Sequence, residues 1–216
     1  MTLRADTLYR FYRSGDEETL AVQGVSLEVR PGEVVVLSGP SGSGKSTLLA
    51  CLAGTDEPSG GTVWVEGERM SGRSEAARAA LRARYVGTMA QASNLQPHLS
   101  LADNVRLVRR IGGRTGRVEP LLGELGIADR ASAWPHELSG GELARAALAV
   151  ALANQPAVLL ADEPTGELDE ATEARLLALL RSRAHLGCAI LLASHSGAVR
   201  SAGDRVLQLE DGRLVA

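Results

Sequence analysis

Hydrophobic residues occur along this chain in short runs, and turn-forming residues separate these runs from one another. Short, fully apolar runs predict buried strands, whereas longer segments that repeat apolar residues every three or four positions predict helices. Strands are predicted at 7–12, 20–29, 34–37, 60–65, 85–89, 158–161, 189–193 and 205–209. Helices are predicted at 46–53, 74–84, 101–111, 117–125, 142–153 and, with Asp169 as its cap, up to position 180.

The middle of the chain, from Leu95 to Ile127, changes character because it contains helical segments and no predicted strand. Gly112 and Gly113 divide it, and the helix at 142–153 is apolar on almost every side, which predicts that it is buried. Outside this segment, strands alternate with helices, and that order favours a largely parallel sheet covered on both faces. We therefore expect residues 1–216 to form a single α/β domain with an inserted helical subdomain.

The composition limits which kinds of molecule this chain is expected to bind. With 44% hydrophobic and 23% charged residues the chain is typical of a globular protein, and its net charge of −3 and 3% aromatic residues argue against nucleic-acid binding. No apolar run reaches the roughly 18 residues that span a bilayer, and the N-terminus lacks the apolar core of a signal peptide. Cys51 and Cys188 lie in apolar surroundings, so we expect two buried, reduced thiols of a cytoplasmic protein.

The single lysine of the chain, Lys45, lies in the sequence GPSGSGKST, although the chain has 23 basic residues. A compact ammonium on a slim stem fits between phosphates, whereas a guanidinium fork does not replace it there. The pattern G-x-x-x-x-G-K-S between a predicted strand and a predicted helix indicates a phosphate-binding loop, whose backbone N–H groups and helix N-terminus hold a nucleoside triphosphate. The predicted ATP-binding residues are Gly39, Pro40, Ser41, Gly42, Ser43, Gly44, Lys45, Ser46 and Thr47.

Within this loop, Lys45 is predicted to bridge the β- and γ-phosphates, Ser46 to bind Mg²⁺, and Thr47 to reach the α-phosphate. An acidic pair, Asp162 and Glu163, follows an apolar run about 115 residues later. A strand that ends in an acid places Asp162 near the phosphates, where it can hold Mg²⁺, and Glu163 can polarise an attacking water.

Residues 138–142 read Leu-Ser-Gly-Gly-Glu. With the elements above, this segment resembles the LSGGQ signature of ABC ATPases, with Glu142 in place of glutamine. The resemblance covers essentially the whole chain, and it implies a P-loop NTPase core with a mostly parallel sheet, an N-terminal antiparallel β subdomain and an inserted α-helical subdomain at about 92–155. It also implies that Ser139, Gly140 and Gly141 bind the γ-phosphate of an ATP held by a partner subunit, so that two chains enclose two ATP molecules.

Other positions correspond to family motifs one at a time. Gln91 matches the glutamine that contacts Mg²⁺ and the attacking water, and Asp169, in GELD, matches the loop that crosses the dimer interface. His195 matches the histidine that contacts the γ-phosphate, although relatives commonly have aspartate where this chain has Ser196.

The family also has an aromatic residue that stacks on adenine. Tyr12 matches it by its spacing to the strand that follows, and Tyr9 and Phe11 are alternatives.

Within the family, the segments LADNV at 101–105 and ADEPTGELD at 161–169 resemble the sequences of the lipoprotein-releasing, macrolide-exporter and cell-division ATPases of bacteria. The resemblance implies an ATP-hydrolysing motor subunit of a bacterial ABC transporter that requires Mg²⁺. The resemblance also implies that this subunit pairs with a second copy of itself, or with a related ATPase subunit, and that it drives a separate integral-membrane permease from the inner face of the membrane.

The permease would dock at a groove bordered by Gln91 and residues 95–101; alternatively, Leu95, Pro97, Leu99 and Leu101 form the core of the helical subdomain. A non-transport ATPase of the cell-division type shares every catalytic residue and stays open as an alternative. A chromosome-maintenance ATPase would need a long coiled coil between the phosphate loop and the signature. Only about 90 residues, without heptads, separate the two motifs here, so this class is excluded. Glu163 and His195 argue against a module that binds ATP without hydrolysing it.

Overall fold

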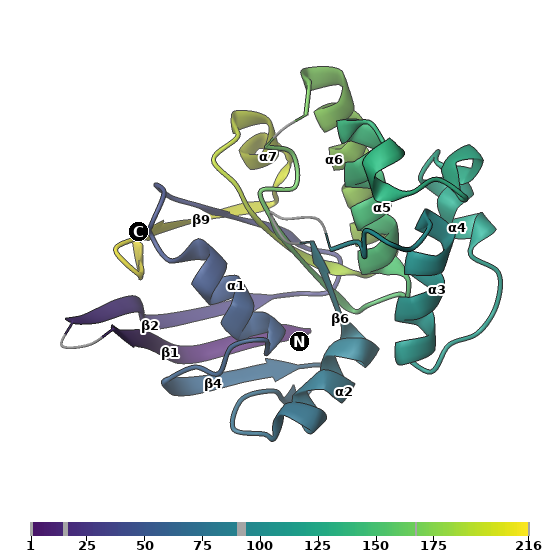
Figure 1. Ribbon diagram of the computed structural model, residues 1–216. Coiled ribbons are helices and arrows are strands. Elements are labelled where there is room, and N and C mark those ends of the chain that lie inside the picture. Colours follow the sequence, from purple (N-terminus) through teal and green to yellow (C-terminus); the bar gives the residue numbers. More distant parts are fainter. Residues whose placement is uncertain (1, 15–16, 90–93, 167, 216) are drawn as a thin grey trace.

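A six-stranded sheet forms the centre of the protein in the computed structural model, which describes residues 2–14, 17–89, 94–166 and 168–215 (Figure 1). Its strands run in the order β10-β9-β3-β8-β7-β6. The ladders from β9 to β6 are parallel, and β10 pairs with β9 in antiparallel fashion. The bounds are β3 Val34–Ser38, β6 Val86–Met89, β7 Val158–Asp162, β8 Ala189–Ala193, β9 Arg205–Glu210 and β10 Arg213–Val215.

Both faces of this sheet are buried, because successive side chains of its central strands enter two different cores. Val34 and Val36 belong to a cluster that includes α5 (Gly140–Leu152) and α6 (Glu170–His185). Val35 and Leu37 belong to a second cluster, which includes α1 (Lys45–Ala53) and the N-terminal strands. The fully apolar runs of the sequence therefore reflect strands covered on both sides.

A second, antiparallel sheet has the order β2-β1-β4-β5, and α1 lies between it and the central sheet (Figure 1). Its strands are β1 Leu3–Ser14, β2 Glu17–Val29, β4 Gly60–Val65 and β5 Glu68–Arg69. Positions 13, 14 and 17–19, which lie between the predicted strands 7–12 and 20–29, extend the strands of the β1–β2 hairpin, in which Tyr12 pairs with Thr19. Tyr12 is exposed there, so no buried face gives this part of the hairpin an alternating pattern.

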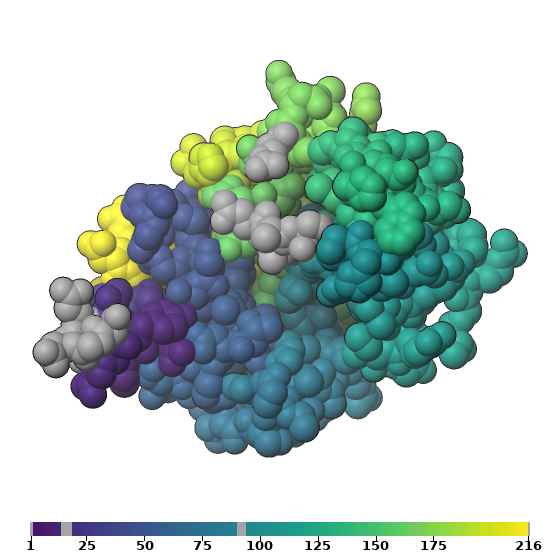
Figure 2. Space-filling model, viewed as in Figure 1, coloured from purple at the N-terminus to yellow at the C-terminus, as the bar shows by residue number. Residues whose placement is uncertain are grey.

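The described chain between β6 and β7, residues 94–157, is largely helical and forms a lobe, coloured teal to green in Figure 2, whose core is continuous with that of the central sheet. It contains α3 Leu101–Ile111, α4 Glu119–Glu124, short 3₁₀ turns at Ala128–Arg130 and Pro135–Glu137, and α5. The predicted burial of α5 is correct for Ala146–Leu152, whereas its first turns are accessible. Helix α4 is shorter than the predicted 117–125, with Pro120 in its first turn. Leu95 and Leu101 are core residues of this lobe, and Pro97 is exposed.

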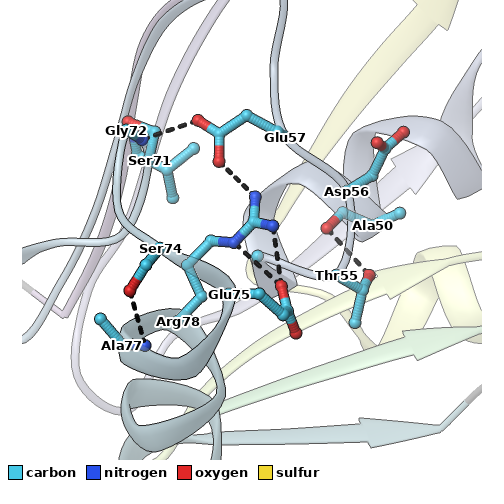
Figure 3. Close-up of polar contacts among 12 residues, drawn as sticks. Ala50, Thr55, Asp56, Glu57, Ser71, Gly72, Ser74, Glu75, Ala77 and Arg78 are labelled. Atoms are coloured by element: carbon cyan, nitrogen blue, oxygen red, sulfur yellow. Dashed lines mark hydrogen bonds and ion pairs between the residues drawn. The ribbon is translucent and has the colours of Figure 1, made fainter.

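Helix α2 (Glu75–Tyr85) is held against the C-terminal end of α1 by arginines. Arg78 lies between Glu57, from the chain after α1, and Glu75 (Figure 3). Arg82 donates to the carbonyl of Gly54, the C-cap of α1, at 2.7 Å. A cation at the carbonyl end of a helix complements its dipole, so these contacts fix α2 to the helix that begins at the phosphate loop.

Both thiols are free. Cys51 is buried and Cys188 is half-buried, and burial raises the pKa of Cys51 to about 12 and that of Cys188 to about 11. Within the described residues, we find no helix with the length and apolar character required to cross a bilayer.

Candidate ATP-binding and hydrolysis site

Three neighbouring parallel strands bring the predicted catalytic groups to one edge of the central sheet. Strand β3 leads into the phosphate loop, β7 into Glu163 and β8 into His195. Backbone hydrogen bonds continue past the strand ends: the Glu163 N–H donates to Ala193 at 2.9 Å, and the Ser194 N–H donates to Leu37 at 3.1 Å. The carboxyl ends of parallel strands are where α/β sheets bind ligands.

Two glycines of the phosphate loop are required by close backbone contacts. A Cβ on Gly39 would lie 2.1 Å from the carbonyl oxygen of Leu209, and one on Gly44, whose φ is +99°, would lie 2.2 Å from that of Ala21. Gly44 is the N-cap of α1 and supplies no side-chain cap, so the first N–H groups of α1 are open to an anion. The buried Ser43 hydroxyl has no hydrogen-bond partner in the described part of the chain.

The ammonium of Lys45 is held by its own loop. Its Nζ donates to the carbonyl oxygens of Gly39 at 2.8 Å and Pro40 at 2.9 Å. Because an ammonium has three N–H donors, one is left for a phosphate oxygen. These two contacts hold the positively charged Nζ of Lys45 close to the backbone of the phosphate loop.

Glu163 and His195 are in direct contact. Glu163 Oε1 lies 2.9 Å from His195 Nδ1, and Glu163 Oε2 accepts from the Ser194 hydroxyl at 3.1 Å. An ionised carboxylate only accepts, so the proton between them belongs to Nδ1. A hydrogen bond from Nε2 to a phosphate then requires a second proton on the ring. The Glu163 side chain is only 16% exposed, whereas that of His195 is 76% exposed.

The backbone at Glu163 is strained. Its φ is +48°, a left-handed value that costs a non-glycine residue on the order of 1 kcal/mol. Hydrogen bonds from its N–H to Ala193 and to its carbonyl from Gly166 hold this conformation. The strained turn lets adjacent acids serve different places: Asp162 ends β7 while Glu163 reaches the histidine.

Sequence reasoning missed Glu173, on α6, which joins two segments of the site. One of its oxygens, Oε1, accepts from the Ser196 hydroxyl at 2.8 Å and from Thr165 at 2.8 Å. The Ser196 N–H also donates to Ser194, which itself bonds Glu163. Ser196 thus obtains a carboxylate partner from α6. The residues lie 23 positions apart, so no local pattern reveals the pair.

The signature residues lie at the N-terminus of α5. Ser139 is the N-cap, and a capping box joins it to Glu142 in both directions. Asp169 caps α6 in a similar way, since it accepts from the N–H of Thr172 at 3.0 Å and from its hydroxyl at 2.7 Å.

A cavity of about 900 Å³ joins the sheet edge to α5. Most of the predicted site residues line it: Gly39, Pro40, Ser41, Gly42, Gly44, Lys45, Ser46, Thr47, Gly140, Asp162, Glu163 and His195. A second cavity of about 410 Å³ lies on the other side of the signature, and Ser139, Gly140, Gly141 and Asp169 are among the residues that line it. One chain therefore presents the signature to two spaces.

Besides Tyr12, four predicted residues that the structure describes do not line the main cavity: Ser43, Ser139, Gly141 and Asp169. Tyr12 does not line it; its hydroxyl donates to Asp56 at 2.7 Å, and the guanidinium of Arg10 lies 4.4 Å from its ring centre. Tyr9, Phe11 and Tyr12 are about equally exposed, at 42%, 43% and 41%, so exposure does not choose among them. Gln91 lies outside the described residues.

The donors in the cavity fit a nucleoside triphosphate with Mg²⁺. The uncapped N–H groups of α1 and the ammonium of Lys45 suit phosphate oxygens. Ser46 and Asp162 line the same cavity, and among described residues no three His, Cys, Asp or Glu gather as a metal site. This set suits Mg²⁺, which usually takes one or two protein oxygens together with substrate phosphates and water.

Comparisons with known proteins agree with this geometry. The family model described as ABC transporter matches residues 22–166, more than half of the chain. The lipoprotein-releasing system ATP-binding protein LolD of Granulibacter bethesdensis is 43% identical over 99% of this chain and 96% of that protein. The macrolide export ATP-binding/permease protein MacB 1 of Yersinia pestis bv. Antiqua is 39% identical over 99% of this chain, which spans only 34% of that longer protein.

Solved structures show the same fold. The dimeric bacterial ABC transporter cassette MJ0796 superposes with a TM-score of 0.93 at 30% identity, over 99% of this chain and 97% of that one. A post-hydrolysis dimer of the same cassette, bound to ADP and Pi, matches equally well. The mostly parallel core, the antiparallel N-terminal sheet and the helical lobe agree with the fold that the sequence predicted. This chain belongs to the ABC transporter family and is one of its ATP-hydrolysing subunits.

Proposed function

We propose that two copies of this chain, or this chain and a related ATPase subunit, enclose two ATP molecules and hydrolyse them to drive a membrane permease. The observation that carries the proposal is the separation of two sets of groups on one chain. Lys45, Glu163 and His195 line the main cavity, whereas Ser139 and Gly141 line the second. In a two-chain arrangement, the signature of one copy completes the phosphate site of the other.

Each residue then has a specific task. The phosphate loop and Lys45 hold the β- and γ-phosphates, and Ser46 and Asp162 hold Mg²⁺, which supplies positive charge against the phosphate oxygens. Glu163, which follows β7 and lines the main cavity, accepts a proton from the attacking water. His195 and Lys45 stabilise charge that develops on the γ-phosphate. Gln91 as a contact to Mg²⁺ and water, and Tyr12 as the adenine platform, stay predictions.

We assign residues 1–216 to one ABC ATPase domain whose helical subdomain spans about 92–155. The permease is inferred from the relatives: LolD is the ATP-binding protein of a lipoprotein-releasing system, and the MacB proteins carry ATP-binding and permease functions. The chain would work at the inner face of the membrane through such a partner. Its docking groove would lie beside residues 95–101, although Leu95 and Leu101 themselves are buried in the helical lobe.

A complementation experiment tests the two-chain site. Ser139→Arg places a bulky cation in the signature and should block ATP-dependent dimerisation while ATP binding persists, and Lys45→Ala should remove ATP binding at its own loop. Neither chain should hydrolyse ATP alone. A mixture should recover activity, because one of its two sites combines the intact phosphate loop of one chain with the intact signature of the other.

The matched control is Ser132→Arg, which adds the same side chain to an exposed position of the helical lobe outside both cavities. It should dimerise and hydrolyse ATP as the wild type does. Normal ATP-dependent dimerisation of Ser139→Arg, together with no recovery in the mixture, would show that the site is complete within one chain.

A further inference from the structure

The hydroxyl of the signature serine is engaged by a carboxylate of its own chain. Ser139 Oγ donates to Glu142 Oε2 at 2.9 Å, and the Ser139 N–H donates to the same oxygen at 2.8 Å. In return, the Glu142 N–H donates to Ser139 Oγ at 3.4 Å. A hydroxyl has one proton to donate, so the Ser139 proton points toward Glu142.

The other carboxylate oxygen of Glu142 faces an arginine from the 3₁₀ turn at Ala128–Arg130. Glu142 Oε1 lies 3.0 Å from Arg130 Nε, and a second nitrogen of Arg130 donates to the Glu137 carbonyl at 2.9 Å. Arg130 is thereby fixed to the segment that leads into the signature. Arg145 and Arg175 line the second cavity together with Glu142. The ion pair of Glu142, however, is with Arg130.

These contacts keep Glu142 charged. The Ser139 N–H, then its hydroxyl, and then the positive charge of Arg130 hold the pKa of Glu142 below its usual range. A glutamine at this position could form the same capping box, because its amide oxygen also accepts. It would carry no charge. The glutamate therefore adds a negative charge one hydrogen bond away from Ser139, which contacts a γ-phosphate if the proposed function holds.

We propose that Arg130 is a positioning residue of the signature, which offsets the charge of Glu142 so that the partner's γ-phosphate can approach Ser139. The inference rests on the two-chain site. Arg130 faces one oxygen of Glu142 as a charge pair and not as a hydrogen bond, because its Nε has no hydrogen-bond partner among the described residues, and the other oxygen stays the acceptor for Ser139. The phosphate must compete with that oxygen for the serine proton, and the competition is easier when Arg130 attracts the carboxylate.

A double-mutant cycle tests the pairing. It uses full-length chains with the additional change Glu163→Gln, so that ATP accumulates in the closed dimer, and it measures the ATP concentration at half-maximal dimerisation by light scattering. Arg130→Ala should raise that concentration about tenfold while Glu142 is present, because a like charge then faces the phosphate unpaired. In the Glu142→Gln background the same change should raise it less than about twofold. The tenfold effect should shrink at high salt.

Two further variants guard against a general loss of structure. Arg130→Gln keeps an N–H donor for the Glu137 carbonyl but removes the charge, and it should behave as Arg130→Ala does. Arg106→Ala is the matched control, since it removes an exposed arginine of the same lobe that pairs with Asp103 and Glu119. It should leave the ATP dependence of dimerisation unchanged.

The outcomes separate the two proposals. An equal effect of Arg130→Ala in both backgrounds, or wild-type behaviour of Arg130→Gln, would show that Arg130 acts only on the backbone and would overturn the inference. Absence of an ATP-dependent dimer in the Glu163→Gln chain itself would contradict the two-chain site instead.

Discussion

The site's two halves on this chain are built in different ways. The hydrolytic half is assembled from β3, β7 and β8, and its contacts join residues far apart in sequence, such as Glu163 and His195, 32 positions apart. The signature half lies at the N-termini of α5 and α6, and its capping contacts join residues three positions apart, such as Ser139 and Glu142. The positions of the functional side chains therefore depend on long-range packing in the hydrolytic half and on local hydrogen bonds in the signature half.

The difference separates the roles of the carboxylates. In the hydrolytic half, Glu163 reaches the cavity from a strained backbone and contacts a histidine. In the signature half, Glu142 accepts from the N–H of the N-cap Ser139, and Asp169 caps α6. Both carboxylates therefore make local contacts around a helix N-terminus, and neither lines the main cavity. Changes in the first half should abolish turnover, whereas changes in the second should act on closure or stability.

The largest effect is expected for Glu163→Gln. An amide cannot accept the proton of the attacking water, so ATP turnover should fall by about 10³-fold. ATP binding should persist and an ATP-dependent dimer should accumulate. Phosphate release and size-exclusion chromatography measure the two properties.

The control for this change is Glu170→Gln, which removes an exposed carboxylate in the first turn of α6. It should leave turnover unchanged. Normal phosphate release from Glu163→Gln would remove Glu163 from the chemistry and with it the contrast between the halves.

Much of the central sheet could be predicted from the sequence because its strands are buried on both faces. The bounds of β4, α3 and β8 agree with the predicted ranges, and β3 and β7 differ by one residue. Helix α7 (Gly197–Ala202) was missed since only Val199 of its six residues is buried, which leaves no apolar periodicity. Strand β10 was also missed, because it is only three residues long and its residues are half-exposed or exposed.

The site shows the same limit. The phosphate loop, Asp162, Glu163 and His195 follow strand ends, so their meeting at one edge could be predicted from order alone. Glu173 and Arg130 lie within helical segments as ordinary charged residues, and only tertiary contacts to Ser196 and Glu142 show what they do.

An intermediate effect is expected for Glu173→Ala. This change removes the acceptor shared by Ser196 and Thr165, so the segment that carries His195 loses a fixed position. Turnover should fall about tenfold with little change in the KM for ATP, because Thr165, Glu173 and Ser196 do not line the main cavity. Steady-state kinetics with matched thermal unfolding measure the effect.

Glu173→Gln is the informative partner of that variant. Its amide oxygen still accepts from both hydroxyls, so it should recover most of the lost turnover. If Glu173→Gln is as slow as Glu173→Ala, the charge of Glu173 matters rather than its hydrogen bonds, and positioning is the wrong account.

The smallest effect is expected for Asp169→Asn, measured as free energy of unfolding along a pH series. Hydrogen bonds from the hydroxyl and then the N–H of Thr172 lower the pKa of Asp169. A carboxyl with a lowered pKa in the folded state stabilises the fold above its unfolded pKa of about 3.9 and loses that contribution as the pH falls through the folded value. Asparagine also caps helices but has no charge.

The variant should therefore be slightly less stable than the wild type at neutral pH, and the two should converge in acid. The effect is small because Asp169 is exposed and its charge is screened by solvent. A difference that persists unchanged into acid would mean that the amide itself fits the cap poorly. A loss of turnover as large as that of Glu163→Gln would place Asp169 in the chemistry, and the division between a hydrolytic half and a capping half would then fail.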